Sequence, residues 1–154
     1  MDGADRRDRD AIVALFDRCS RQTVQDRFFA PIRAMPSGYL DGAVAGDPYV
    51  HDAVVCRRDA SVVGLASLAV VPDCGSPTVE LGVLIEDAWQ RHGIGAAMTE
   101  VLFGRARLRK VRTVRAEVLA GRTELLAALG KTLRLVHTVS TEEGVMADFT
   151  LPGN

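Results

Sequence analysis

The sequence has few cysteines and no excess of charge of either sign. Its three cysteines, Cys19, Cys56 and Cys74, form no Cys-x-x-Cys pair. An odd number of scattered cysteines excludes a disulfide framework and favours a reducing, cytoplasmic location. Nineteen basic and twenty acidic residues give a net charge of −1. The chain therefore lacks the basic field that drives non-specific nucleic-acid binding, and we expect no nucleic-acid partner.

Long apolar runs and metal-ligand patterns are also missing. The longest mainly apolar run, Val62 to Val71, is about half of the ~20 residues that a membrane-spanning helix needs. The segment from Met1 to Arg6 has no apolar stretch of the kind found in secretory signals. The histidines, His51, His92 and His137, are dispersed, and no ligand spacing resembles a zinc site. We therefore expect neither a membrane nor a metal ion to be involved.

The residues that are present are typical of one mixed α/β domain covering residues 1–154. The length, 47% hydrophobic residues and 25% charged residues fit an ordinary globular domain. Amphipathic spacing predicts helices, and β-branched apolar runs between turn residues predict strands. The expected helices are 7–19, 23–29, one that begins at residue 94, and one around residues 125–133. The expected strands are 53–56, 61–71, 78–85, 111–119, 135–139 and 145–151. This order predicts a mixed sheet flanked by about four helices.

The most informative segment joins the strand Thr78–Ile85 to the turn Gln90–Gly95 and the helix that follows. A turn that opens a helix aims unpaired main-chain N–H groups at one point, where the helix dipole adds positive potential, and this suits a pyrophosphate. Gly93 and Gly95 supply backbone freedom and a close approach. The alternative is a helix start that merely tolerates glycine. The third glycine of a dinucleotide fingerprint is absent, so we expect no nicotinamide cofactor.

Two stretches of this segment carry a family resemblance. Glu80–Ile85 and Trp89–Met98 closely resemble the acyl-CoA-binding motif of the GNAT superfamily of N-acetyltransferases. More loosely, Arg18–Phe29 and Asp47–Val55 are similar to the GNAT domains of bacterial protein-lysine acetyltransferases. The resemblance implies a GNAT-like twisted mixed sheet, acetyl-CoA as co-substrate, and an N-acetyltransferase that acts on a primary amine. Protein lysine is the preferred acceptor, ahead of a small amine.

The resemblance also implies which residues contact acetyl-CoA. The main chain at Val83 and Ile85 would pair with the pantetheine arm like an added strand, and Val83 or Leu84 would donate a hydrogen bond to the thioester carbonyl. Such a fixed donor is worth about 3–4 kcal/mol at an oxyanion site. The pyrophosphate would be held by the main-chain N–H groups of six consecutive residues: Arg91, His92, Gly93, Ile94, Gly95 and Ala96.

Glu80 is the candidate general base, because family members often carry a glutamate at the matching place on this strand. Acyl transfer needs an uncharged amine, and a nearby carboxylate can take its proton. Period-two alternation places Thr78, Glu80, Gly82 and Leu84 on one face of the strand. Gly82 would then leave open space beside the Glu80 carboxylate. The alternative is a strand glutamate that is paired with an arginine or simply solvated.

The chain departs from the family pattern at several places. No tyrosine occurs within residues 122–133, where the family often carries the general acid. Arg122 replaces a usual asparagine, and Leu133-Arg134 replaces a usual Gly-Phe. These departures motivate an alternative function, a non-catalytic acyl-CoA-binding sensor or regulatory module.

The start of the chain shows no strand pattern where the family places its first strand. Residues 1–10 lack the alternation of a strand. Two interpretations stay open. Either the N-terminus is truncated relative to the family, or the sheet begins one strand short and exposes an edge that a second subunit covers in a homodimer.

Overall fold

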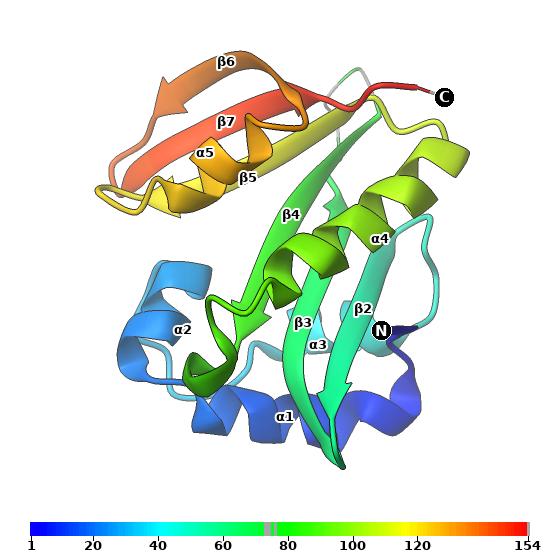
Figure 1. The fold of residues 1–154 in the computed structure, drawn as a ribbon, viewed down its shortest axis with the longest axis vertical. Coiled ribbons are helices and arrows are strands. Elements are labelled where there is room, and N and C mark those ends of the chain that lie inside the picture. Colours follow the sequence, from blue (N-terminus) through cyan, green and yellow to red (C-terminus); the bar gives the residue numbers. More distant parts are fainter. Residues whose placement is uncertain (73–74, 76, 154) are drawn as a thin grey trace.

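The computed structural model describes residues 1–72, 75 and 77–153, and its main feature is one seven-stranded sheet (Figure 1). The strand order is β1-β2-β3-β4-β5-β7-β6. The strands are β1 (Asp2–Gly3), β2 (His51–Arg58), β3 (Ser61–Val70), β4 (Thr78–Ile85), β5 (Thr113–Leu119), β6 (Arg134–Ser140) and β7 (Gly144–Thr150). The helices are α1 (Arg9–Arg18), α2 (Arg21–Phe28), α3 (Ser37–Val44), α4 (Ile94–Leu108) and α5 (Glu124–Leu129), with short 3₁₀ turns at Arg6–Asp8 and Asp87–Trp89.

The six predicted strands are present close to their predicted positions, which confirms the mixed sheet. Two of the helix predictions need correction. The loop-rich segment between residues 31 and 48 contains α3, whose buried residues are Leu40, Ala43 and Val44. Its glycines lower helix propensity, so packing against β2 rather than local preference holds this helix. The last helix is shorter than predicted, because α5 ends at Leu129 and Leu133 lies in the following turn.

The expectation of a missing first strand is also wrong. Asp2 and Gly3 form β1, which pairs antiparallel with Val55 and Val54 of β2. A two-residue strand is too short for an alternation pattern to reveal it. It covers part of the outer edge of β2, so this portion of the edge is not open to a second subunit. A homodimer stays a prediction.

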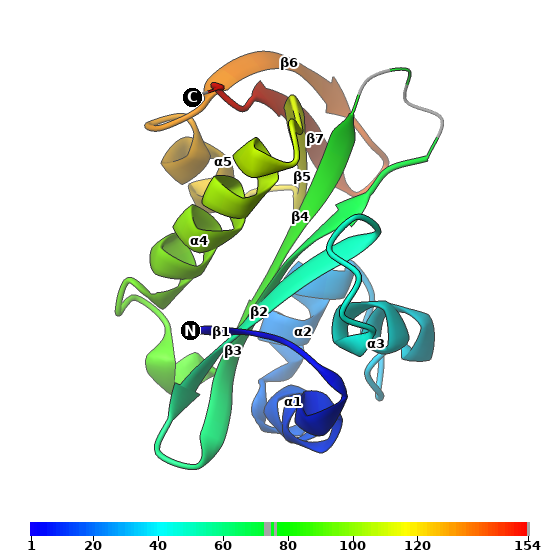
Figure 2. The same ribbon diagram turned by 90° about the vertical axis from the view of Figure 1, so that its right-hand side faces the viewer.

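The helices form one layer on each face of the sheet, as Figure 2 shows. Helices α1, α2 and α3 cover one face, and α4 and α5 cover the other. Along β4 the side chains alternate as predicted: Leu81 belongs to the core on the α4 side, and Leu84 belongs to the core on the α1 side. Glu80 and Gly82 therefore face the layer of α1 to α3. In the described ranges, no helix is both long enough and apolar enough to cross a membrane.

Strands β4 and β5 separate after a short parallel contact. Their register runs from Thr78 opposite Thr113 to Glu80 opposite Arg115. Beyond Glu80 the two strands diverge, and they form the two arms of a V in Figure 1. The later half of β4 still pairs with β3 on its other side. The divergence leaves one edge of β4 open in the middle of the sheet, and this opening positions the candidate site.

Candidate active site

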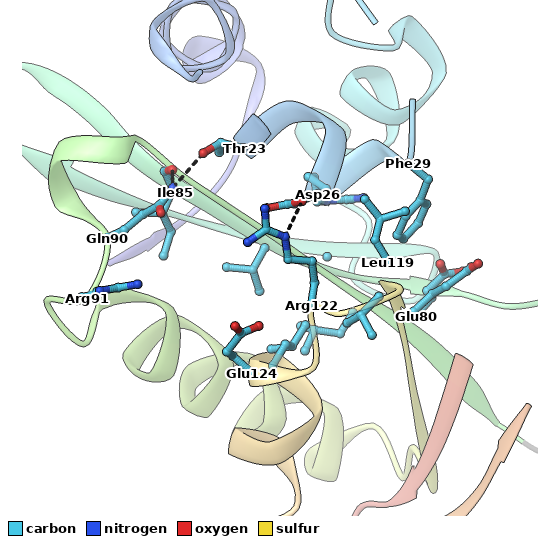
Figure 3. Close-up of a pocket in the computed structure, with 17 residues that line it drawn as sticks. Thr23, Asp26, Phe29, Glu80, Ile85, Gln90, Arg91, Leu119, Arg122 and Glu124 are labelled. Carbon is cyan, nitrogen blue, oxygen red and sulfur yellow. Dashed lines mark hydrogen bonds and ion pairs between the residues drawn. The ribbon is translucent and has the colours of Figure 1, made fainter. Parts of the chain in front are cut away.

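A pocket of about 450 Å³ fills the opening between the diverging strands (Figure 3). One wall is β4 from Glu80 onward, and the opposite wall is β5 from Glu117 to Leu119. Helix α2 contributes Thr23, Asp26 and Arg27. In Figure 3, Glu80 lies at one end of the pocket, and Gln90 and Arg91 lie at the other. The six residues from Glu80 to Ile85 span about 17 Å of extended strand, so the pocket follows the length of β4.

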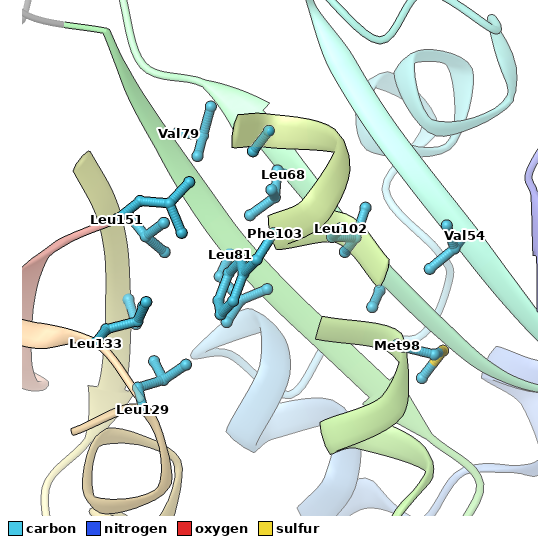
Figure 4. Packing of buried hydrophobic residues seen from close by; sticks show 14 of the residues in the cluster. Val54, Leu68, Val79, Leu81, Met98, Leu102, Phe103, Leu129, Leu133 and Leu151 are labelled. Atoms are coloured by element: carbon cyan, nitrogen blue, oxygen red, sulfur yellow. The ribbon is translucent and has the colours of Figure 1, made fainter. Parts of the chain in front are cut away.

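Helix α4 holds the glycine turn against the end of β4. Its inner face, including Met98 and Leu102, is completely buried in the core shown in Figure 4. Each such side chain contributes about 1.5–3 kcal/mol by leaving water. Gly93 precedes the helix with a φ of +79°, a backbone conformation that glycine adopts without strain. A Cβ atom at Gly95 would lie only 3.2 Å from Cδ1 of Ile85. The glycines therefore permit both the bend and the close approach of α4 to β4.

The turn before α4 presents main-chain N–H groups that no described residue uses. The first backbone bond of the helix is donated by Ala97 to the carbonyl of Gly93. Within the described chain, the N–H groups of residues 91–96 donate no hydrogen bond. The ring of His92 is engaged locally, with Nδ1 2.8 Å from the carbonyl oxygen of Gln90. The predicted N–H groups therefore lie together at the start of a 15-residue helix, where anions are favoured.

The predicted main-chain contacts at Val83 and Ile85 lie along the open edge of β4, whereas the N–H of Leu84 points toward β3. Val83 and Ile85 direct their side chains toward the core beneath α4, and Leu84 is buried on the other face. The carbonyl of Ile85 already accepts a hydrogen bond of 3.0 Å from Nε2 of Gln90. The same Gln90 side chain is 3.0 Å from Oγ1 of Thr23, so it ties α2 to the end of β4. Ile85 is thereby fixed in place, and the edge at Val83 stays open.

Glu80 is exposed and lines the pocket, as expected, but Gly82 does not leave open space beside it. A Cβ atom at Gly82 would lie 2.2 Å from Nη2 of Arg27 and 2.5 Å from Cζ. The guanidinium of Arg27 therefore occupies the space that the missing side chain leaves. Arg27 belongs to a predicted helix, but no local pattern connects it with Gly82, because the two residues are far apart in the sequence.

Glu117 is a second pocket carboxylate that the sequence analysis did not single out. It lies on β5 one alternation beyond Arg115, which is the register partner of Glu80. Burial raises the pKa of Glu117, and so does the repulsion of its charge by Glu80 and Glu143. The polar side of the strand alternation around residues 115 and 117 was visible in the sequence. Its closeness to Glu80 follows only from the parallel pairing of β4 with β5.

Replacing Glu117 with glutamine is expected to stabilise the protein at pH 7 and not at about pH 4. A raised pKa means that the charged form of Glu117 is disfavoured in the folded state. The charge of Glu117 therefore destabilises the folded protein only above the pKa of glutamate in the unfolded chain, about 4.3. This destabilisation grows as the pH rises from there through the pKa of Glu117 in the folded state. Thermal unfolding at both pH values measures the effect. Glu100→Gln, an exposed carboxylate change on α4, is the control, and an equal gain for both variants would contradict the prediction.

An ion pair crosses the mouth of the pocket. Nε of Arg122, in the loop before α5, lies 3.5 Å from Oδ1 of Asp26 on α2 (Figure 3). Both side chains are partly exposed, so the pair itself contributes little stability. Arg122, which replaces the asparagine of the family pattern, thus links α2 with the β5–α5 loop.

The ionisable residues of the site do not form a metal centre. No group of three or more histidine, cysteine, aspartate or glutamate side chains suited to a metal ion occurs among the residues that the structure describes. Among the pocket carboxylates, Asp26 stands beside Arg122, whereas the charges of Glu80 and Glu117 repel each other.

A comparison with protein families identifies the class of protein that this sheet and pocket define. Residues 10–130 match the Acetyltransferase (GNAT) family. The chain therefore belongs to the GNAT family of N-acetyltransferases. Comparison with the sequences of curated proteins finds no significant match.

Solved structures of bacterial acetyltransferases share the fold at low sequence identity. The GNAT domain of PAT from S. lividans is 19% identical with a TM-score of 0.84, covering 96% of this chain and 88% of that one. Ribosomal-protein-alanine N-acetyltransferase from Brucella melitensis is 20% identical with a TM-score of 0.75, covering 97% and 96%. The protein yncA from Salmonella typhimurium, whose structure contains its cofactor acetyl-CoA, is 16% identical with a TM-score of 0.78, covering 99% and 92%.

Proposed function

We propose that this protein transfers an acetyl group from acetyl-CoA to a primary amine, with protein lysine preferred over a small amine. The observation that carries the proposal is the pocket between β4 and β5. It combines an open strand edge, a turn of unused N–H groups at one end and two carboxylates at the other. These features supply what acyl transfer from a CoA thioester needs, in the order in which an extended ligand would meet them.

The residues of the glycine turn fit the pyrophosphate of acetyl-CoA. Main-chain N–H groups from Arg91 to Ala96 would bind its oxygens, and the dipole of α4 would favour their negative charge. The open edge at Val83 would pair with the amides of the pantetheine arm, as an added strand would. The N–H of Val83, which faces the open edge, would donate to the thioester oxygen as negative charge develops on it, whereas the N–H of Leu84 faces β3. Acetyl-CoA supplies the acetyl group in activated form, as a thioester.

Glu80 would remove the proton that makes the amine unreactive. It is exposed within the pocket at the end opposite the glycine turn, so its carboxylate can meet an amine that enters from solvent. Direct transfer is further supported by the cysteines. Burial and the nearby Asp87 and Glu86 raise the pKa of Cys19 to about 12, and Cys56 is 1% exposed. Neither described cysteine is therefore suited to carry the acetyl group on a thiolate.

The charge of the acceptor end supports a cationic acceptor such as lysine. Glu80 and Glu117 lie on the two walls of the pocket, and Glu143 is near enough to raise the pKa of Glu117 further. A cluster of carboxylates attracts an ammonium group before its proton is removed. The looser resemblance of Arg18–Phe29 and Asp47–Val55 to protein-lysine acetyltransferases adds to this preference.

The decisive experiment measures release of free CoA thiol from acetyl-CoA with a panel of amines that includes lysine peptides and small amines. We expect acetyl-CoA to bind by calorimetry and at least one amine to increase thiol release above the rate of hydrolysis. Binding without acceleration by any amine would favour the sensor or regulatory module. No heat with acetyl-CoA or CoA would overturn both functions and indicate that the fold serves protein contact alone.

A further inference from the structure

Arg27 is a cation in the pocket with no anionic partner in the described chain. Its Nε is buried and makes no hydrogen bond, and no carboxylate among residues 1–72, 75 and 77–153 pairs with its guanidinium. Instead the guanidinium lies over two aromatic rings that meet edge to face, with Cζ 4.6 Å from the centroid of Phe28 and 4.7 Å from that of Tyr39. Stacking of this kind contributes about 0.5–2 kcal/mol and leaves the N–H donors without acceptors.

The other partly buried arginines in the described ranges do have hydrogen-bond acceptors, which are carboxylates in most cases and the carbonyl of Pro152 for Arg107. Arg105 and Arg109 share the buried Asp52, and Arg115 binds Asp148 at 2.9 Å. Arg57 pairs with Asp8 in the same way. A buried donor without an acceptor costs about 1–3 kcal/mol, and more when it is charged. The lack of an acceptor for Arg27 therefore distinguishes it from the other partly buried arginines that the structure describes.

The surroundings of Arg27 hold its guanidinium in one place. Gly82 allows it to lie flat on β4, since any side chain at that position would collide with it. Tyr39 is itself anchored, with its hydroxyl 2.7 Å from Oγ of Ser67 and its ring 5.1 Å from the ring of His51. Burial lowers the pKa of His51, and the charge of Arg27 lowers it further, so no second cation competes at this position. These contacts hold the guanidinium of Arg27 in place as a single positive charge that lines the pocket.

We propose that Arg27 binds a carboxylate of the acceptor, and that the pocket therefore selects amines that carry a carboxylate close to the reacting nitrogen. The planar guanidinium binds carboxylates in a bidentate manner. Glu80 and Gly82 point to the same face of β4 and lie about 7 Å apart, as residues i and i+2 of a strand do. An acceptor held at both points has its amine at Glu80 and its carboxylate at Arg27. This inference rests on the proposed acetyl transfer to an amine.

Two sources of the carboxylate share this chemistry, and matched pairs of acceptors distinguish them. An acidic residue next to lysine is tested with the peptides acetyl-Glu-Lys-amide and acetyl-Gln-Lys-amide. The carboxylate of a small amino acid is tested with 5-aminopentanoate and 5-aminopentanamide. For the pair that matches the acceptor, we expect the carboxylate form to have a KM about tenfold lower at similar kcat, because a charge-assisted hydrogen bond contributes about 1.5–3 kcal/mol.

Variants of residues in α2 test whether Arg27 is the source of the preference for carboxylate acceptors. Arg27→Gln is expected to remove the preference for the carboxylate by raising its KM about tenfold, with no change for the amide. Arg27→Lys should retain part of the preference, because it keeps the charge but loses the planar fork. Arg21→Gln makes the same charge change at an exposed position of the same helix and should behave as the wild type. Thermal unfolding and acetyl-CoA affinity report whether each variant is folded.

The outcomes separate this inference from the proposed function. Turnover of amines by the wild type without preference in either pair would overturn the role of Arg27 and leave acetyl transfer intact, even if Arg27→Gln did not fold. An equal rise in the KM of the carboxylate and amide acceptors in Arg27→Gln would also overturn it. If no amine is acetylated, calorimetry with 5-aminopentanoate in the presence of CoA decides. Binding to the wild type that is weaker in Arg27→Gln would support the carboxylate site at Arg27. Equal binding to the two proteins, or no binding to the wild type, would refute it.

Discussion

Replacing Glu80 with glutamine is expected to lower kcat by about 100-fold or more, the contribution of a positioned general base. Glutamine has nearly the same size and keeps an acceptor oxygen, but it cannot take a proton from the amine. Affinity for acetyl-CoA should not change, because Glu80 lies at the opposite end of the pocket from Gln90 and Arg91 (Figure 3). Thiol release at saturating acceptor measures kcat, and calorimetry measures the affinity.

Comparison with Glu117→Gln shows whether the loss of kcat is specific to Glu80. Both carboxylates line the pocket, and their charges interact. If Glu80 is the base, Glu117→Gln should reduce kcat far less than Glu80→Gln does. Unchanged turnover in Glu80→Gln would show that the assignment is wrong, and a large loss in Glu117→Gln alone would transfer the role to Glu117.

Replacing Ala96 with glutamate is expected to raise the Kd of acetyl-CoA by roughly 30-fold or more. Ala96 is exposed in the first turn of α4, which contains no acidic residue. A carboxylate there would stand beside the pyrophosphate, and repulsion of about 2 kcal/mol at an intermediate dielectric corresponds to this change in affinity. The fold should not suffer, since an acidic residue at a helix N-terminus stabilises it by about 0.3–1 kcal/mol.

Ala96→Gln is the matched control, because it adds the same volume without the charge. Calorimetry with acetyl-CoA gives the two affinities, and thermal unfolding shows whether both variants fold. The difference between them should shrink at high ionic strength, where exposed charges are screened. Equal affinity of Ala96→Glu and Ala96→Gln for acetyl-CoA at low salt would place the pyrophosphate elsewhere.

Much of the cofactor end of the site could be predicted from the sequence, because it consists of neighbouring residues. The strand, the glycine turn and the helix are continuous from Thr78 to Leu108. Turn geometry depends on Gly93, whose φ is +79°, and the face of Glu80 depends on the two-residue period of a strand. Each of these properties is decided within a few residues of chain, so the local pattern suffices to predict it.

The acceptor end could not be predicted in the same way. Glu80 and Glu117 line one pocket because β4 and β5 run parallel through three residue pairs and then separate. Arg27 lies over Gly82 because the helix α2 packs against β4 on one face of the sheet. The helix α3, which contributes Tyr39 to the same cluster, is not among the helices that the sequence predicts, because its glycines favour other conformations and only tertiary packing overrides them.

The sequence by itself determined the order of six of the strands and four of the helices, the glycine turn and the side of β4 that carries Glu80. The tertiary structure alone decided where β4 and β5 part, and that the guanidinium of Arg27 fills the space over Gly82. The physical reason is the range of the interactions involved. Backbone conformation and side-chain alternation depend on near neighbours, whereas contacts between distant segments depend on how the whole sheet and its helices pack together.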